Sequence, residues 1–123
     1  MLRANCLFNQ ILHDRKYLTE AERIAAAAEK HWFNTSNGAI SDAGMFAHLL
    51  CESFLYLSKI DQNSHWREAV QRALVFVHEH VQDANGYYGE RWEKKVEDVS
   101  PEAKLIYQAS AARAYLVYAL DGL

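Results

Sequence analysis

A repeat with a period of 48 residues limits what this 123-residue chain can fold into. When the sequence is shifted by 48 places, Glu20-Ala21 aligns with Glu68-Ala69 and Asn37-Gly38 aligns with Asn85-Gly86. Each unit is predicted to consist of a mostly apolar helix, a short link, an amphipathic helix, an Asn-Gly turn that ends this helix, and a longer loop. Repeats of this length are typical of stacked helical hairpins. The repeat therefore predicts an all-α fold.

Five segments have the apolar spacing of helices and are separated by turn residues. The last of them starts with a cap, a proline at its first position and an acidic residue, which is a typical helix start. The first predicted helix has no capping residue near Met1, which suggests that it is part of a longer helix. The predicted helices are Leu2–His13, Tyr17–Phe33, Met45–Ile60, His65–Val81 and the segment from Ser100 to about Leu120.

The first, third and fifth helices differ from the other two in how their polar residues are distributed. The third has an apolar stripe, which includes Phe46, Leu49 and Phe54, and only a thin polar line, whereas the second and fourth have broad charged faces. Because a helix that is apolar on most sides is normally enclosed by others, we expect the odd helices inside and the even helices outside. This arrangement is a partial helical toroid in a single all-helical domain of residues 1–123, with loops 39–44 and 87–99 at one end.

The composition excludes several functional classes. Half of the residues are hydrophobic and the net charge is −3, so neither a disordered chain nor a basic nucleic-acid surface is expected. No apolar run is long enough to cross a membrane, and the N-terminus lacks the apolar region of a signal peptide. We expect a cytoplasmic protein without a membrane partner, unless the chain is a piece of a secreted protein. Cys6 and Cys51 lie at apolar helical positions, which predicts buried, reduced thiols.

Polar residues on the inner helices and aromatic residues at the long-loop end form a candidate site. Aromatic faces with nearby carboxylates and amides suit a sugar, because its C–H face stacks while its hydroxyls need paired hydrogen bonds. Trp92 is expected to stack on a sugar ring, and Asp42 and Gln108 to bind hydroxyls. The equally weighted alternative is that Tyr87 and Trp92 only close the end of the helical bundle. The candidate residues are Asp42, His48, Glu52, Tyr87, Tyr88, Trp92 and Gln108.

Other kinds of site are not supported. His78 and His80 are two residues apart, a spacing that splays their rings around a helix, so no metal site is expected. The chain has no Cys-x-x-Cys pair, no glycine-rich phosphate loop and no Gly-x-Ser-x-Gly, and we expect no cofactor. It also has no adjacent Asp-Asp pair. Asp42 and Glu52 would form a glycosidase pair only if the fold brought them within about 5–10 Å.

Several motifs resemble glycoside hydrolase family 76 (GH76), the α-1,6-mannanases, over nearly the whole chain. They are "RKYLTEAERI", "NGAISDAGMF", "DANGYYGERW" and "LIYQASAARAYL", of which the run Gln108–Arg113 is the most specific. The resemblance is to the C-terminal half of that family, and it implies part of an (α/α)6 toroid and a mannan-type oligosaccharide as partner. The family's catalytic Asp-Asp pair lies in the other half, so the resemblance implies no independent catalysis. The alternatives are a non-catalytic interaction or dimerisation module and a fragment of an N-acylglucosamine 2-epimerase-like toroid.

Five helices of a twelve-helix toroid would leave two apolar edges, one beside the first helix pair and one beside the fifth helix. Because monomers rarely expose large apolar patches, we expect a homo-oligomer, most simply a dimer. The alternative is that the five helices close into a compact monomeric bundle. The residues expected at or near these edges are Leu7, Ile11, Leu105, Ile106, Leu116 and Val117.

Overall fold

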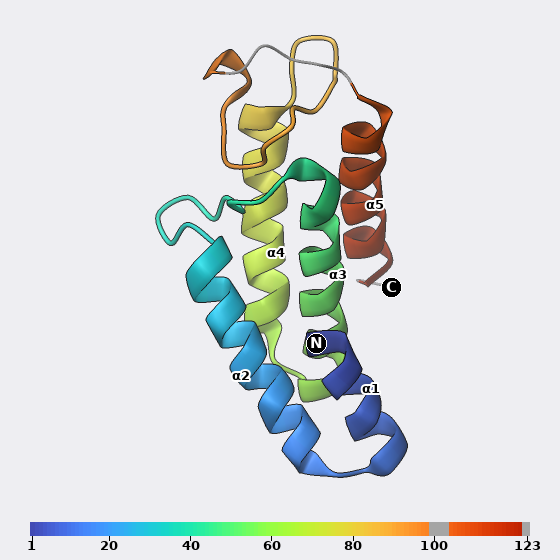
Figure 1. The fold of residues 1–123 in the computed structure, drawn as a ribbon. Coiled ribbons are helices and arrows are strands. Elements are labelled where there is room, and N and C mark those ends of the chain that lie inside the picture. Colours follow the sequence, from blue (N-terminus) through green and yellow to red (C-terminus); the bar gives the residue numbers. More distant parts are fainter. Residues whose placement is uncertain (99–103, 122–123) are drawn as a thin grey trace.

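The computed structural model describes residues 1–98 and 104–121, and five α-helices account for most of them (Figure 1). Within these residues there is no β-strand, and only isolated bridges join the loops. The all-α prediction is therefore confirmed, while the expected start of the last helix at Ser100 lies outside the described residues. The elements are α1 (Leu2–Leu12), α2 (Arg15–Trp32), α3 (Gly44–Asp61), α4 (Ser64–Phe76), the π-helix η1 (Val77–Val81), the 3-10 helix η2 (Val96–Asp98) and α5 (Leu105–Asp121).

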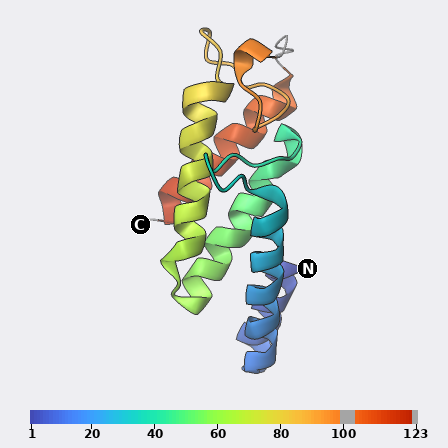
Figure 2. The same cartoon turned by 90° about the vertical axis from the view of Figure 1, so that its left-hand side faces the viewer.

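The helices lie in two layers. Helices α1, α3 and α5 form one layer, and α2 and α4 form a second layer that packs against one face of the first (Figure 1). Helix α3 is central, because it packs against each of the other four helices. In the side view of Figure 2, α5 crosses behind α4. The alternation of inner and outer helices expected from the repeat is thus present in the fold.

Local side-chain chemistry fixes where the helices start and end. The carboxylate of Asp14 accepts the Lys16 N–H at 3.0 Å, and the amide oxygen of Asn63 accepts the His65 N–H at 3.1 Å, so both residues cap the helices that follow. Gly38 ends the turn after α2 with a φ of +79°, and a Cβ atom there would lie 2.7 Å from the Cβ of Arg72. Glycine is therefore required at this stop by both backbone conformation and space.

The core lies between the two layers and is centred on Phe54 of α3. The Phe54 ring stacks on Phe33 at 5.2 Å and meets the edge of Trp66 at 5.3 Å. Cys6 and Cys51 are both buried and unpaired, as predicted. Burial raises the pKa of the Cys6 thiol to about 11 and that of Cys51 to about 12, so neither thiol ionises near neutral pH.

The two edges of the helical array are apolar and exposed. On the α1 side these residues are Leu7 and Ile11, and on the α5 side they are Leu105, Ile106 and Leu116. Val117 is half-buried instead. The edges therefore have the composition expected of an incomplete helical array.

Candidate functional site

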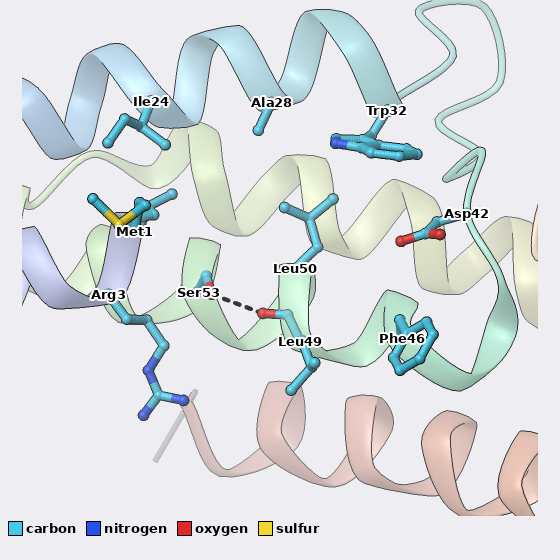
Figure 3. Close-up of a pocket in the computed structure, with 11 residues that line it drawn as sticks. Met1, Arg3, Ile24, Ala28, Trp32, Asp42, Phe46, Leu49, Leu50 and Ser53 are labelled. Carbon is cyan, nitrogen blue, oxygen red and sulfur yellow. Dashed lines mark hydrogen bonds between the residues drawn. The ribbon is translucent and has the colours of Figure 1, made fainter.

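A groove of about 500 Å³ runs between α2 and α3, from Met1 toward the long loops (Figure 3). Its walls change character along its length. Around Met1, Ile24, Ala28, Leu49 and Leu50 they are aliphatic, and we call this the aliphatic part. Toward the loops they consist of Trp32, Asp42 and Phe46, which we call the aromatic end.

The aromatic end places one carboxylate between two rings. In Figure 3 Asp42 lies between Trp32, at the end of α2, and Phe46, in the first turn of α3. Oδ1 of Asp42 accepts the Ala43 N–H at 2.7 Å, which fixes the carboxylate at the start of α3. Trp32 is half-buried, and Phe46 is 55% exposed. The arrangement offers two aromatic surfaces and a hydrogen-bond acceptor on one side of the molecule.

His48 does not line this groove, because its side chain turns toward α5. Its Nδ1 lies 2.9 Å from Oγ of Ser110, a buried hydroxyl on that helix. The pair forms a polar link across the α3–α5 contact. His48 therefore contributes to packing between the inner helices.

Glu52 is held by two arginines from the neighbouring inner helices. Its carboxylate accepts from Nε of Arg113 at 2.6 Å and from Nη1 of Arg3 at 3.4 Å, and its side chain is only 11% exposed. These residues also line a smaller groove of about 270 Å³ across α1, α3 and α5. The Arg113 hydrogen bond holds the pKa of Glu52 below its ordinary value, so this carboxyl stays ionised. Glu52 is unsuited to act as a general acid.

Gln108 is fully engaged with the loop that precedes α5. Its side chain accepts the Tyr88 N–H at 2.8 Å and donates to the Tyr88 carbonyl at 2.9 Å. The Tyr88 ring lies 6.0 Å from that of Tyr115, whose hydroxyl donates to the Leu74 carbonyl at 3.0 Å. Burial and the adjacent Tyr88 raise the pKa of Tyr115. The expectation that Gln108 binds sugar hydroxyls is corrected here, because its hydrogen bonds fasten the loop to α5.

Trp92 cannot stack on a sugar in this fold, because its side chain has 0% exposure. The ring lies against Gly44, where a Cβ atom would approach Trp92 Nε1 to 3.0 Å. The loop is held there by the Gly44 N–H, which donates to the Glu90 carbonyl at 2.6 Å. The prediction for Trp92 is therefore wrong, and closing the end of the bundle is its role. Tyr87, in the same loop, is exposed.

The structure brings Gln108 and Tyr88 into direct contact at the long-loop end, and of the candidate residues predicted from sequence only Asp42 lines the α2–α3 groove. Its two aromatic neighbours, Trp32 and Phe46, were not among the predicted site residues, and the apolar stripe of the third predicted helix had assigned Phe46 to a buried face. Their positions could have identified them from the sequence. Trp32 is the last residue of α2 and Phe46 is in the first turn of α3, so both lie beside the connection 33–43.

Two further kinds of site can be assessed from the described residues. Residues 1–98 and 104–121 contain no group of three or more His, Cys, Asp or Glu side chains placed to hold a metal ion. In the same residues, no helix combines the length and apolar character needed to span a membrane.

The fold is similar to the solved structure of a selenomethionine derivative of a GH76 α-mannanase from Bacteroides thetaiotaomicron. The two chains are 27% identical and superpose with a TM-score of 0.83 over 98% of this chain and 33% of that one. The chain thus spans about a third of the length of that mannanase. No protein-family model matches the sequence, and no curated protein matches it either. The structural match confirms the resemblance to the C-terminal part of GH76 and the partial (α/α)6 toroid of five helices.

Proposed function

We propose that this chain is a mannan-binding part of a GH76-like toroid that does not hydrolyse glycosidic bonds by itself. The observation that carries the proposal is the match to a GH76 α-mannanase over 98% of the chain at 27% identity. The position of the α2–α3 groove supports it, because its aromatic end includes Asp42 of the long loop that precedes the inner helix α3.

The aromatic end of the groove has the chemistry that a pyranose ring requires. An exposed Phe46 ring and the half-buried Trp32 provide apolar surfaces for the C–H face of a sugar. Asp42 uses one carboxylate oxygen on the Ala43 N–H, and its other oxygen accepts a sugar hydroxyl in the proposed complex. One stack and one or two hydrogen bonds give weak binding, with a Kd on the order of millimolar.

The absence of independent catalysis follows from what glycoside hydrolysis demands. The reaction needs two carboxyl groups about 5–10 Å apart, one of which is protonated at working pH. Glu52 is ionised and bound to Arg113 and Arg3, so it does not serve as that acid. Glu52 therefore does not provide Asp42 with the protonated partner that the reaction needs.

Tryptophan fluorescence tests the binding proposal directly. Of the three tryptophans, Trp66 and Trp92 are buried, so a saturable change on adding α-1,6-linked mannotriose reports on Trp32. We expect Phe46→Ala and Asp42→Asn to weaken the response at least several-fold. The matched control is Phe8→Ala, since Phe8 is 49% exposed on α1 and lies outside the groove.

Two results would contradict the proposal. One is the absence of any response of the wild-type chain at tens of millimolar mannotriose. The other is a response that Phe8→Ala weakens as much as Phe46→Ala does. Mannanase activity of the purified chain that Asp42→Asn removes would contradict the non-catalytic part of the proposal.

The exposed apolar edges favour a second function, assembly of the chain into a homodimer. Burial of apolar surface contributes roughly 25 cal/mol per Å², so covering an edge of a few hundred Å² stabilises a dimer by several kcal/mol. Sedimentation equilibrium tests this, with Ile11→Glu on the α1 edge and Leu105→Glu on the α5 edge as disrupting variants. A wild-type mass of 14.1 kDa at high micromolar concentration would refute it.

A further inference from the structure

The smaller groove, of about 270 Å³, differs in chemistry from the α2–α3 groove. Most of its lining comes from the segment between Glu52 and Lys59 of α3 and the segment between Arg113 and Asp121 of α5, and we call it the α3–α5 groove. It shares only Arg3 with the α2–α3 groove, and in Figure 3 this side chain extends away from the aliphatic part, toward α5. Its lining combines charged side chains with an apolar wall.

The Glu52 carboxylate is largely buried and holds two arginines that face solvent. The side chain of Glu52 is 11% exposed, whereas those of Arg3 and Arg113 are 50% and 54% exposed. Among the described residues, Glu52 accepts from Arg113 only through Nε and from Arg3 only through Nη1. The terminal nitrogens of Arg113, together with Nε and Nη2 of Arg3, are therefore available to a ligand.

The Asp121 carboxylate repeats this arrangement about two helical turns further along α3 and α5. Its side chain is 8% exposed and lies 2.6 Å from Nη1 of Arg67 and 3.0 Å from Nζ of Lys59. Since one cation neutralises one carboxylate, the four cations held by these two carboxylates leave an excess of two positive charges. The whole chain has a net charge of −3, so the excess is local. A cleft with an excess of one charge attracts ions of the opposite sign.

The apolar wall indicates that the ligand has an organic body. Leu55 is buried, Val117 is half-buried and Leu120 is exposed, and all three line the groove. Carbon atoms of a ligand can contact this wall while its charged group faces the arginines. Guanidinium groups match the oxygens of a phosphate or a carboxylate with two parallel N–H bonds. The groove therefore fits an organic oxyanion better than a free inorganic ion.

We propose that the α3–α5 groove binds a small organic oxyanion, a phosphate ester or a carboxylate, between Arg3 and Arg113 and beside Lys59. The two buried carboxylates keep these cations in place, and the ligand accepts from the N–H groups that they leave available. This site goes beyond the proposed function, because it requires neither a sugar nor the aromatic end of the α2–α3 groove.

NMR titration of the arginine Nε–H resonances tests the proposal one side chain at a time. The probes are phenyl phosphate and benzoate at low ionic strength, where screening is weakest, and the controls without a ring are inorganic phosphate and acetate. We expect at least one probe to shift Arg3 and Arg113 saturably and to leave Arg23 unshifted, since Arg23 is bound to Glu20 outside the groove. The probe that binds more tightly identifies the charged group as phosphate or carboxylate.

Two results of this titration would contradict the proposal. Saturation by neither phenyl phosphate nor benzoate would overturn it. Binding of inorganic phosphate or acetate as tight as that of the corresponding probe would overturn the assignment of an organic ligand, because the apolar wall would then contribute nothing.

Charge-removing variants separate the groove from the charge of the whole chain. Arg113→Gln removes one arginine, and Lys59→Gln removes an exposed cation while Asp121 keeps its contact with Arg67, so the second variant retains the fold. We expect each to raise the dissociation constant about threefold, as the loss of one exposed charge pair does. Arg23→Gln makes the same change of charge on α2 and should leave the constant unchanged. An unchanged constant in a groove variant that circular dichroism shows to be folded, or an equal rise with Arg23→Gln, would overturn the proposal.

Discussion

Gly44→Ala tests whether the loop after α4 is fastened to the start of α3 by close packing. A Cβ atom at Gly44 would lie 2.9 Å from the Glu90 carbonyl oxygen and 3.0 and 3.1 Å from two atoms of the Trp92 ring. Both neighbours are restrained: the Glu90 carbonyl accepts the Gly44 N–H at 2.6 Å, and Trp92 is completely buried. The substitution therefore forces the loop away from α3 or strains its backbone.

The size of the effect follows from two opposing terms. Inserting a methyl group into a closed contact costs about 1–3 kcal/mol, while replacing glycine by alanine in a helix returns up to about 1 kcal/mol, and less at the first turn. We expect a net loss of about 1–2 kcal/mol in the free energy of unfolding. Because small domains are stable by only about 5–15 kcal/mol, this change is easily measured.

Urea unfolding followed by circular dichroism and tryptophan fluorescence measures the loss. Gly89→Ala is the matched control in the same loop, since the nearest atom to its Cβ would be Val81 Cγ1 at 3.9 Å, and it should change stability by less than about 0.5 kcal/mol. Gly44→Ala should cost less stability in a Trp92→Phe background than in the wild type, because the crowding Nε1 atom of the ring is removed. Equal stability of Gly44→Ala and Gly89→Ala would refute the reasoning.

Three other predictions concern the described contacts. Gln108→Ala leaves the Tyr88 amide and carbonyl unpaired, which should lower the free energy of unfolding by about 1–3 kcal/mol. It should also speed tryptic cleavage within loop 87–98. Unchanged cleavage would show that Gln108 does not hold this loop on α5. Cys51, on the central helix α3, should react with a disulfide reagent only as fast as the chain unfolds, because its thiol is buried and its pKa is raised; rapid labelling of Cys51 in the native chain would contradict this. Because the folded-state pKa of Glu52 is lowered, its stabilisation is complete above the ordinary pKa of 4.5 and is lost as the pH falls below it. Glu52→Gln should therefore lose less stability between about pH 6 and pH 3.5 than the wild type, as urea midpoints would report.

The helices and their layers could be predicted from sequence because they depend on local patterns. The side-chain caps Asp14 and Asn63 each accept an N–H two residues further along the chain, within the helix that they start. The alternation of apolar and charged helices fixed which layer each one joins. These features need no knowledge of distant contacts.

The candidate site could be predicted only in part, because accessibility depends on what lies over a residue. Trp92 is aromatic and in a loop, but the absence of a side chain at Gly44 lets that loop fold down over α3. Phe46 and Leu49 belong to an apolar stripe that periodicity assigned to the interior, and they are exposed because no described element covers them. A sequence pattern identifies a face that needs a partner, and it does not say whether the partner is present.

The arrangement of α1 and α2 also has a consequence for local opening. Helix α1 packs mainly on α2, and polar links such as Tyr56 to Gln10 and His65 to Glu29 join this pair to the rest of the fold. The groove leaves much of the α2–α3 contact uncovered, so separating the pair from α3 exposes less new apolar surface than unfolding α3 itself. Amide hydrogens of α1 and α2 should therefore exchange with solvent through openings that leave α3, α4 and α5 intact. The free energy needed for opening therefore differs along the chain. It is lowest for the α1–α2 hairpin and highest for α3, which packs against each of the other four helices.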